Sequence, residues 1–250
     1  MRVSRRKFVA LAGAAALAAP AVRSLAATRK IKAVAFDGFP IIDPRPVFAK
    51  AEEVLPGKGL ALSNAWRIRQ FEYSWLRTLG GRYVDFWQVT EQSLIYAAEV
   101  SGIALSAEQR GALMQTWLEL KAWPDVLPVL TELKAAGIRM AFLSNLTETM
   151  LDAAVKNANL DGFFEPHLST DRVKAFKPDP RAYQMGLDAF KLRKEEIAFA
   201  AFAGWDAAGA KWFGYPTFWV NRLNTPIEEL DAMPDGVGSG LGDLVKFVLG

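Results

Sequence analysis

The sequence predicts an α/β fold, a Rossmann-like doubly wound parallel sheet with an inserted helical cap domain. Short apolar segments of strand length alternate with helical segments in the second half of the chain, which is typical of strands joined by crossover helices. Between the first strand and this region lies a long stretch with helical periodicity and no strand signal. The 250 residues, half of them apolar, are enough to form a large packed core.

The start of the chain differs in composition from the rest. It carries five basic residues and no acid up to residue 26, with twin arginines in Ser4–Phe8 and an Ala/Leu-rich run from Val9 to Ala19. Residues 1–27 are therefore expected to be a twin-arginine export signal, which directs the protein to the periplasm and is cleaved near Ala27. The apolar run is short for a membrane span, so no membrane attachment is expected after cleavage; an uncleaved anchor is the alternative.

The charge of the mature chain argues against a nucleic-acid partner. When the five positive charges of the signal are set aside, the formal charge falls from +3 to −2. No stripe of Lys and Arg stands out in the remainder, whereas nucleic-acid binding needs one. The chain has no cysteine, which excludes disulfides and thiolate chemistry and agrees with an oxidising compartment.

The first elements of the mature chain are a strand and several helices. The unbroken apolar run 31–36 predicts a strand that is buried on both faces. Apolar residues at helical intervals predict helices over 60–79 and 84–100, and Ser106 starts a third helix with the spacing of a capping box. The predicted domains are an α/β core of residues 28–45 and 123–250 and a helical cap of residues 46–122.

From residue 125 onward, helices and strands alternate. Strands are predicted at 139–143, near 167–168, at 197–202 and at 216–220, with a helix before the first and between each pair. The Pro/Gly-rich stretch 224–242 is predicted to be a loop. Because the cap is inserted directly after the first strand, it can lie over the strand ends as a lid.

Polar side chains occur where the predicted strands end. Asp37 follows the first strand, Ser144 and Asn145 follow the second, Asp206 lies just beyond the fourth, and Lys177 sits in a loop before a helix. Ligands bind outside the carboxyl ends of parallel strands, so we expect these groups to share one pocket. An ammonium about 4 Å from Asp37 would contribute roughly 4 kcal/mol of Coulomb attraction and keep that carboxylate ionised. An ionised, partly desolvated carboxylate can act as a nucleophile.

Several ordered motifs carry a resemblance to a known family. The chain resembles the haloacid dehalogenase superfamily and, within it, the L-2-haloacid dehalogenases, over nearly all of the mature sequence. The resemblance implies an α/β core, a helical cap, and catalysis with no metal and no organic cofactor. The segments that match are Phe36–Asp37, Trp66–Arg77, Gly81–Trp87, Leu143–Asn145, Phe176–Tyr183, Gly204–Gly209 and Trp219–Arg222.

The resemblance implies a role for each matching residue. Asp37 would attack C2 of a short L-2-haloacid, and water would hydrolyse the resulting ester, with inversion at C2. Lys177 would stabilise this nucleophile, and Asp206 would orient the lysine or activate water. Arg67 and Asn145 match the groups that receive the departing halide. The other substrate-binding positions are Ser144 and Tyr183, for the substrate carboxylate and its support, and Phe39, Ile68, Phe71, Phe86 and Trp205, for the apolar pocket.

The sequence also departs from the family's pattern near the nucleophile. Residues 40–42 are Pro-Ile-Ile in place of Gly-Thr-Leu, and Ala201 and Ala203 replace a serine and an asparagine. Losing two hydrogen bonds to charged groups, at about 1.5–3 kcal/mol each, would lower the rate by about 10² to 10⁴. Phosphatase activity is not expected, because Phe39 stands where the superfamily's phosphatases have a second acid and Asp206 lacks the paired acid that holds Mg²⁺.

Three functions are consistent with these residues. The first is hydrolytic dehalogenation of short L-2-haloacids. The second keeps the displacement at C2 but expels an amine, as in azetidine-2-carboxylate hydrolase of the same superfamily. The third is a periplasmic carboxylate-binding protein that has lost turnover. The expected partner is a small 2-substituted carboxylate in each case, and the aromatic-rich helix 60–79 is expected to be a self-association face of a homodimer.

Overall fold

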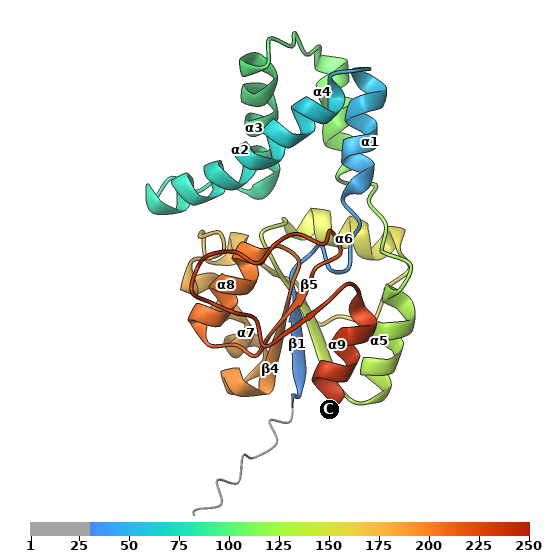
Figure 1. The fold of residues 1–250 in the computed structure, drawn as a ribbon, viewed down its shortest axis with the longest axis vertical. Helices are drawn as coiled ribbons and strands as arrows, with labels where there is room; N and C mark the ends of the chain where they lie inside the picture. Colours follow the sequence, from blue (N-terminus) through green and yellow to red (C-terminus); the bar gives the residue numbers. More distant parts are fainter. Residues whose placement is uncertain (1–30) are drawn as a thin grey trace, which may run out of the picture.

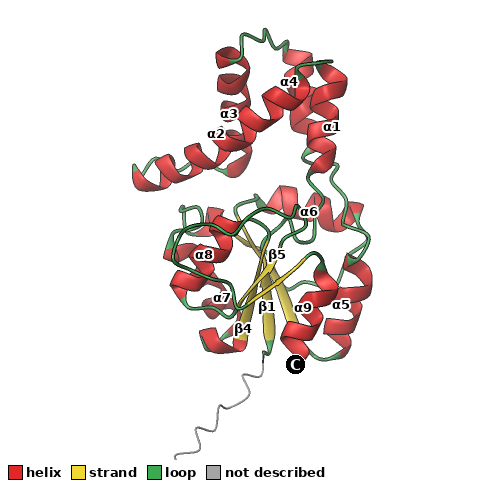
Figure 2. Ribbon diagram, in the orientation of Figure 1, coloured by secondary structure: helices red, strands yellow, loops and turns green. Residues whose placement is uncertain are grey.

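The structure, a computed structural model, describes residues 31–250, so the export signal predicted for residues 1–27 lies outside the described residues. The described chain forms a six-stranded parallel sheet with helices on both faces, which confirms the predicted doubly wound fold (Figures 1 and 2). The strand order is β3-β2-β1-β4-β5-β6. The strands are β1 (Ala33–Phe36), β2 (Arg139–Ser144), β3 (Leu168–Ser169), β4 (Ile197–Ala201), β5 (Thr217–Val220) and β6 (Gly236–Gly238).

The strand order reverses at β1, because β2 and β3 lie on one side of it and β4 to β6 on the other. Such a reversal opens a crevice at the carboxyl ends of the two strands that meet there, here β1 and β4. All four residues of β1 are buried, as the continuous apolar run predicts. Val34 and Phe36 pack into the core on one face, and Ala33 and Ala35 pack into the core on the other.

Helices from the second half of the chain cover the two faces of the sheet. The face of Val34 packs against α5 (Val126–Ala135), α6 (Glu148–Asn157) and α9 (Leu241–Leu249). The opposite face packs against α7 (Pro180–Phe190) and α8 (Gly204–Phe213). Two short 3-10 helices, η1 (Thr170–Arg172) and η2 (Lys194–Glu196), complete this part.

Four helices lie between β1 and α5 and stand over the carboxyl ends of the strands (Figure 1). They are α1 (Arg45–Val54), α2 (Gly59–Leu79), α3 (Phe86–Val100) and α4 (Ala107–Thr116). The capping box predicted at Ser106 is present at the start of α4. The two connections to these cap helices run side by side, because Ile42 pairs with Ala122 and Trp123 N–H donates to the Ile41 carbonyl at 3.0 Å.

The prediction of a loop over residues 224–242 was wrong in part. Residues Gly236–Gly238 form the edge strand β6, and α9 begins at Leu241. A side chain at Gly236 could not fit, because its Cβ would lie 2.7 Å from the Phe218 ring. Gly236 and Gly238 allow β6 to pack closely against Phe218, and these glycines are among the residues that had indicated a loop.

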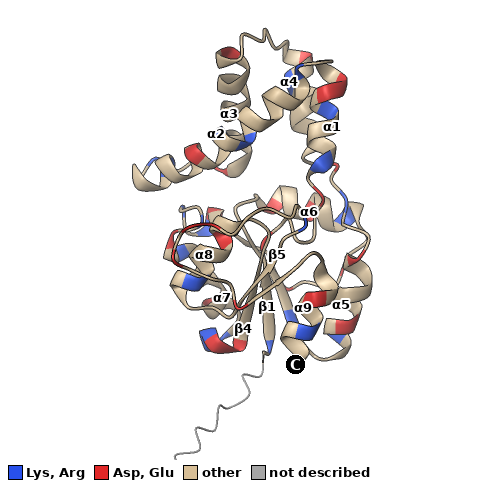
Figure 3. Ribbon diagram, viewed as in Figure 1, with Lys and Arg blue, Asp and Glu red and all other residues tan. Residues whose placement is uncertain are grey.

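Acidic and basic residues are interspersed over the cap and the sheet-containing part (Figure 3).

Within residues 31–250, no helix has both the length and the apolar character that crossing a bilayer requires.

Candidate active site

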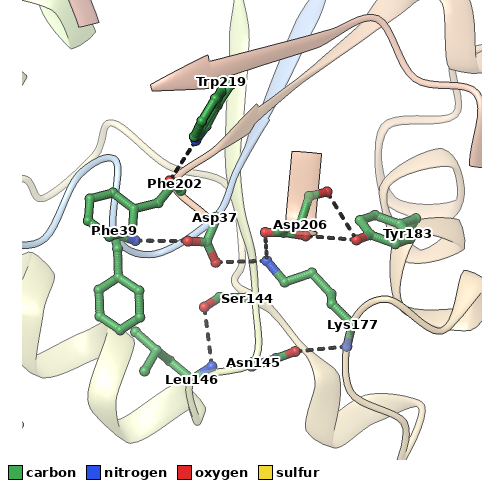
Figure 4. A network of polar contacts seen from close by, with 10 residues as sticks. All are labelled: Asp37, Phe39, Ser144, Asn145, Leu146, Lys177, Tyr183, Phe202, Asp206 and Trp219. Carbon is green, nitrogen blue, oxygen red and sulfur yellow. Dashed lines mark hydrogen bonds and ion pairs between the residues drawn. The ribbon is translucent and has the colours of Figure 1, made fainter. Parts of the chain in front are cut away.

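The structure brings three of the predicted residues together at the reversal point of the sheet (Figure 4). Asp37 directly follows β1, Asp206 lies in the first turn of α8 after β4, and Lys177 lies in the loop before α7. The Lys177 ammonium is 2.7 Å from Asp37 Oδ1 and 2.5 Å from Asp206 Oδ2. The lysine side chain is 1% exposed, so these two carboxylates take the place of water around its charge.

Asp206 also accepts a hydrogen bond from a buried tyrosine. The Tyr183 hydroxyl, on α7, donates to Asp206 Oδ1 at 2.7 Å, and the Tyr215 hydroxyl donates to the Tyr183 carbonyl at 2.6 Å. α8 carries Gly209 at this contact because a Cβ there would lie 2.5 Å from the Tyr183 hydroxyl oxygen. The expectation that Tyr183 binds substrate is corrected: this fully buried side chain does not line the cavity and supports Asp206 instead.

Burial and charge set the protonation of this network. Burial lowers the pKa of Lys177, but the charges of Asp206 and Asp37 raise that pKa by more, so the amine stays protonated at neutral pH. Burial raises the pKa of Asp206 to about 6, against the opposing effect of the Lys177 charge. Burial, together with the charge and hydrogen bond of Asp206, raises the pKa of Tyr183, which therefore remains a donor. The ionised network of two carboxylates and one ammonium carries a net charge of −1.

A cavity of about 640 Å³ opens beside this network, between the cap and the strand ends. Four of the five apolar residues predicted for the pocket line it: Phe39, Phe71, Phe86 and Trp205. Ile68 does not line it and is 55% exposed, because consecutive residues of α2 point in different directions around the helix. Phe202 and Trp117 also line the cavity, but the sequence analysis did not predict them. Phe202 directly follows β4, and the expectation that ligands bind at the carboxyl ends of the strands would have indicated it.

Three of the hydrogen-bond donors that line the cavity are Arg67, Ser144 and Asn145. Arg67 reaches it from α2, and within residues 31–250 its guanidinium has no hydrogen-bond or ion-pair partner. Asn145 Oδ1 accepts the backbone N–H of Lys177 at 3.0 Å, which leaves the amide NH₂ to donate into the cavity. Ser144 Oγ accepts the Leu146 N–H at 3.2 Å and keeps its own proton for a ligand. These donors line the same cavity as Asp37, where they are available to an anionic ligand.

The positions that depart from the family's pattern carry side chains with no hydrogen-bonding group. Ile41 and Ala201 are fully buried, and Ala203 lines the cavity with no polar group. Asp37 Oδ2 accepts the Phe39 backbone N–H at 3.2 Å. The Asp37 carboxylate therefore receives a hydrogen bond from the main chain, whereas Ile41, Ala201 and Ala203 have no side-chain donor to offer it.

Side chains outside the cavity hold the loops on either side of Asp37. The Trp123 indole donates to the Phe39 carbonyl at 2.9 Å, and the Arg222 guanidinium donates to the Pro40 carbonyl at 2.9 Å. The Trp219 indole donates to the Phe202 carbonyl at 2.9 Å, in the loop that leads to Asp206 (Figure 4). Within residues 31–250, no cluster of three acidic or histidine side chains is arranged to hold a metal ion.

Known proteins are similar to this chain in sequence and in fold. The family model of haloacid dehalogenase-like hydrolases matches residues 12–214. The (S)-2-haloacid dehalogenase of Pseudomonas sp. (strain YL) is 39% identical over 218 residues, which is 87% of this chain and 94% of that protein. The crystal structure of the L-2-haloacid dehalogenase RSc1362 has a TM-score of 0.86 and 40% identity, covering 88% of this chain and 100% of that one.

A second similar structure contains a covalently bound ligand. The L-2-haloacid dehalogenase from Xanthobacter autotrophicus, with chloropropionic acid covalently bound, has a TM-score of 0.81 and 34% identity, covering 88% of this chain and 99% of that one. The model match, the identity over most of both chains and the shared fold agree with one another. The chain belongs to the haloacid dehalogenase-like hydrolase family.

Proposed function

We propose that this protein is a hydrolase that replaces the halogen at C2 of short L-2-haloacids with a hydroxyl group, through an ester on Asp37. The observation that carries the proposal is the buried Lys177 ammonium, 2.7 Å from Asp37 Oδ1, beside a cavity that also presents an anion site. The similarity to dehalogenases, one of them with chloropropionic acid covalently bound, supports the same reaction.

In the first step, a carboxylate oxygen of Asp37 forms a bond to C2 of the substrate. The carbon–halogen bond breaks, and the halide leaves with the bonding electron pair. Arg67 and the Asn145 amide NH₂ are placed to receive the halide, and the Ser144 hydroxyl is placed to bind the substrate carboxylate. The aromatic lining excludes water, so that Asp37 attacks as a poorly solvated nucleophile.

In the second step, water attacks the carbonyl carbon of the Asp37 ester and transfers a proton to Asp206. The bond between that carbon and the ester oxygen breaks, and the departing oxygen takes up a proton to give the 2-hydroxy acid. The product thus carries an oxygen that came from Asp37, while the oxygen of water remains in the carboxylate. Each turnover consumes one water and releases one halide and one proton, and C2 is inverted.

The location and assembly of the protein are part of the proposal. The twin arginines and the Ala/Leu-rich run support export to the periplasm and removal of residues 1–27. Two apolar side chains at the end of α2 support a homodimer, because Leu76 is 60% exposed and Leu79 is 85% exposed.

The reaction is tested with the two enantiomers of 2-chloropropionate and with azetidine-2-carboxylate. We expect chloride release from the L enantiomer, D-lactate as the product, and no release by an Asp37→Asn variant. Ring-opened amino acid without chloride release would instead support displacement of an amine at C2. Saturable binding of all three compounds without turnover would show a carboxylate-binding protein and would refute both reactions.

A further inference from the structure

The loop that carries Lys177 is held from two sides by side-chain acceptors. The Phe176 backbone N–H donates to Thr78 Oγ1, in the last turn of α2, at 3.0 Å. The next N–H, of Lys177, donates to Asn145 Oδ1 at 3.0 Å. The first acceptor belongs to the cap and the second to the loop after β2, so the backbone of the lysine is fixed between the two parts of the molecule.

The cap also holds the side chain of Phe176. The Tyr83 ring stacks on it with centroids 4.7 Å apart, and the Phe86 ring contacts its edge at 6.1 Å. The Tyr83 hydroxyl donates to Asp171 Oδ1 at 2.6 Å, in η1, just before the lysine loop. The junction between α2 and α3 therefore contacts the segment 171–177 near both of its ends.

The hydroxyl of Thr78 is itself oriented. It donates to the Ser74 carbonyl at 2.9 Å, so its lone pairs remain for the Phe176 N–H. The Lys177 amine lies between two carboxylates at 2.7 and 2.5 Å, and such contacts tolerate little movement of the backbone that carries them. A displacement of about 1 Å of a reacting group can cost roughly 10²-fold in rate.

We propose that Thr78 is a positioning residue for Lys177, with Tyr83 in support, so that the cap takes part in activating the nucleophile as well as lining the cavity. This inference rests on the proposed function, because it gives Lys177 the task of stabilising Asp37. The cap thereby acts on the chemistry through the main chain of Phe176.

Thr78→Val tests the contact, because it keeps the shape of the side chain and removes the acceptor. We expect the kcat for chloride release to fall roughly three- to tenfold, the worth of one hydrogen bond, with KM changed less than about twofold. The acid limb of the kcat profile should move to higher pH, because a displaced ammonium stabilises the carboxylates less. Thr78→Ser should restore both quantities.

The matched control is Thr131→Val. Thr131 makes the same contact within its helix, donating to the Leu127 carbonyl at 2.7 Å, but lies on the exposed side of α5. This variant should keep the kcat and the pH profile of the wild type. Tyr83→Phe gives a second test at the site, since it leaves the stacked ring and removes only the bond to Asp171, and it should change kcat and the acid limb in the same direction as Thr78→Val.

Hydrogen exchange of the peptide that contains residues 171–178 supplies a readout without turnover. Thr78→Val should raise the exchange of the Phe176 amide at least about threefold, and Thr131→Val should not. An unchanged kcat, acid limb and exchange rate in Thr78→Val would overturn the inference, as would a loss of kcat that Thr78→Ser fails to restore. If the wild type releases no chloride, the proposed function fails, and the exchange rates alone decide whether Thr78 holds the loop.

Discussion

Replacing Tyr183 by phenylalanine should move the acid limb of activity to higher pH and leave the core packed as before. The hydroxyl donates to Asp206 Oδ1 at 2.7 Å, and the pKa of Asp206 is raised to about 6, chiefly by burial. A hydrogen bond to a charged group is worth about 1.5–3 kcal/mol, so its loss should raise that pKa by about one to two units. An acid with a raised pKa keeps its proton to higher pH, so the ionised form that accepts the proton of water would be lost below about pH 7–8 instead of about pH 6.

The assay is chloride release at saturating substrate between about pH 5 and about pH 9. Tyr215→Phe is the control, because its buried hydroxyl donates at 2.6 Å to the Tyr183 carbonyl and does not contact Asp206. That variant should lose about 1 kcal/mol of unfolding free energy and keep the wild-type acid limb. An acid limb that stays in place in Tyr183→Phe, or that moves equally in both variants, would refute this reasoning.

Three further substitutions test other contacts. Lys177→Met should lower the single-turnover rate of chloride release by at least about 10³-fold, because two buried carboxylates then face each other without the ammonium between them. A loss of less than about tenfold would contradict this. Gly209→Ala should lower the unfolding free energy by about 1–3 kcal/mol, because the new Cβ would lie 2.5 Å from the Tyr183 hydroxyl; an unchanged urea midpoint would argue against it. Arg222→Met should destabilise the fold by about 1–3 kcal/mol at neutral pH. Burial raises the pKa of Asp125, but the hydrogen bonds from Arg222 and Leu241 and the Arg222 charge lower it by more. The stabilisation by the ion pair is therefore lost as the pH falls through this lowered pKa, and the difference between the urea midpoints of wild type and variant should narrow there.

The parallel sheet was predictable because its strands are short apolar runs that are buried on both faces. Residues 33–36 and 197–201 show this pattern without interruption, and the helices between strands carry periodic apolar residues. β6 shows no such pattern, since Val237 is its sole apolar side chain and is itself exposed. Its pairing with β5 depends on close contact with Phe218, a long-range fit that no local pattern contains.

The meeting of Asp37, Lys177 and Asp206 was predictable from topology, because the carboxyl ends of parallel strands share one edge of the sheet. The direction in which each side chain points from its helix was harder to predict from the sequence. Tyr183 points toward Asp206 and away from the cavity, and Ile68 faces solvent one residue after Arg67. Contacts between distant segments, such as the Trp123 indole on the Phe39 carbonyl, follow from tertiary packing and have no signature in the sequence.

The decisive measurement is a single turnover of L-2-chloropropionate with protein in excess, in water enriched in ¹⁸O, followed by mass spectrometry of the peptide that contains Asp37. If an ester forms on Asp37 and water attacks its carbonyl carbon, ¹⁸O enters the Asp37 carboxylate and the lactate from that turnover carries none. Label in the lactate and none in Asp37 would mean that water attacks C2 itself, and the aspartyl ester would have to be abandoned.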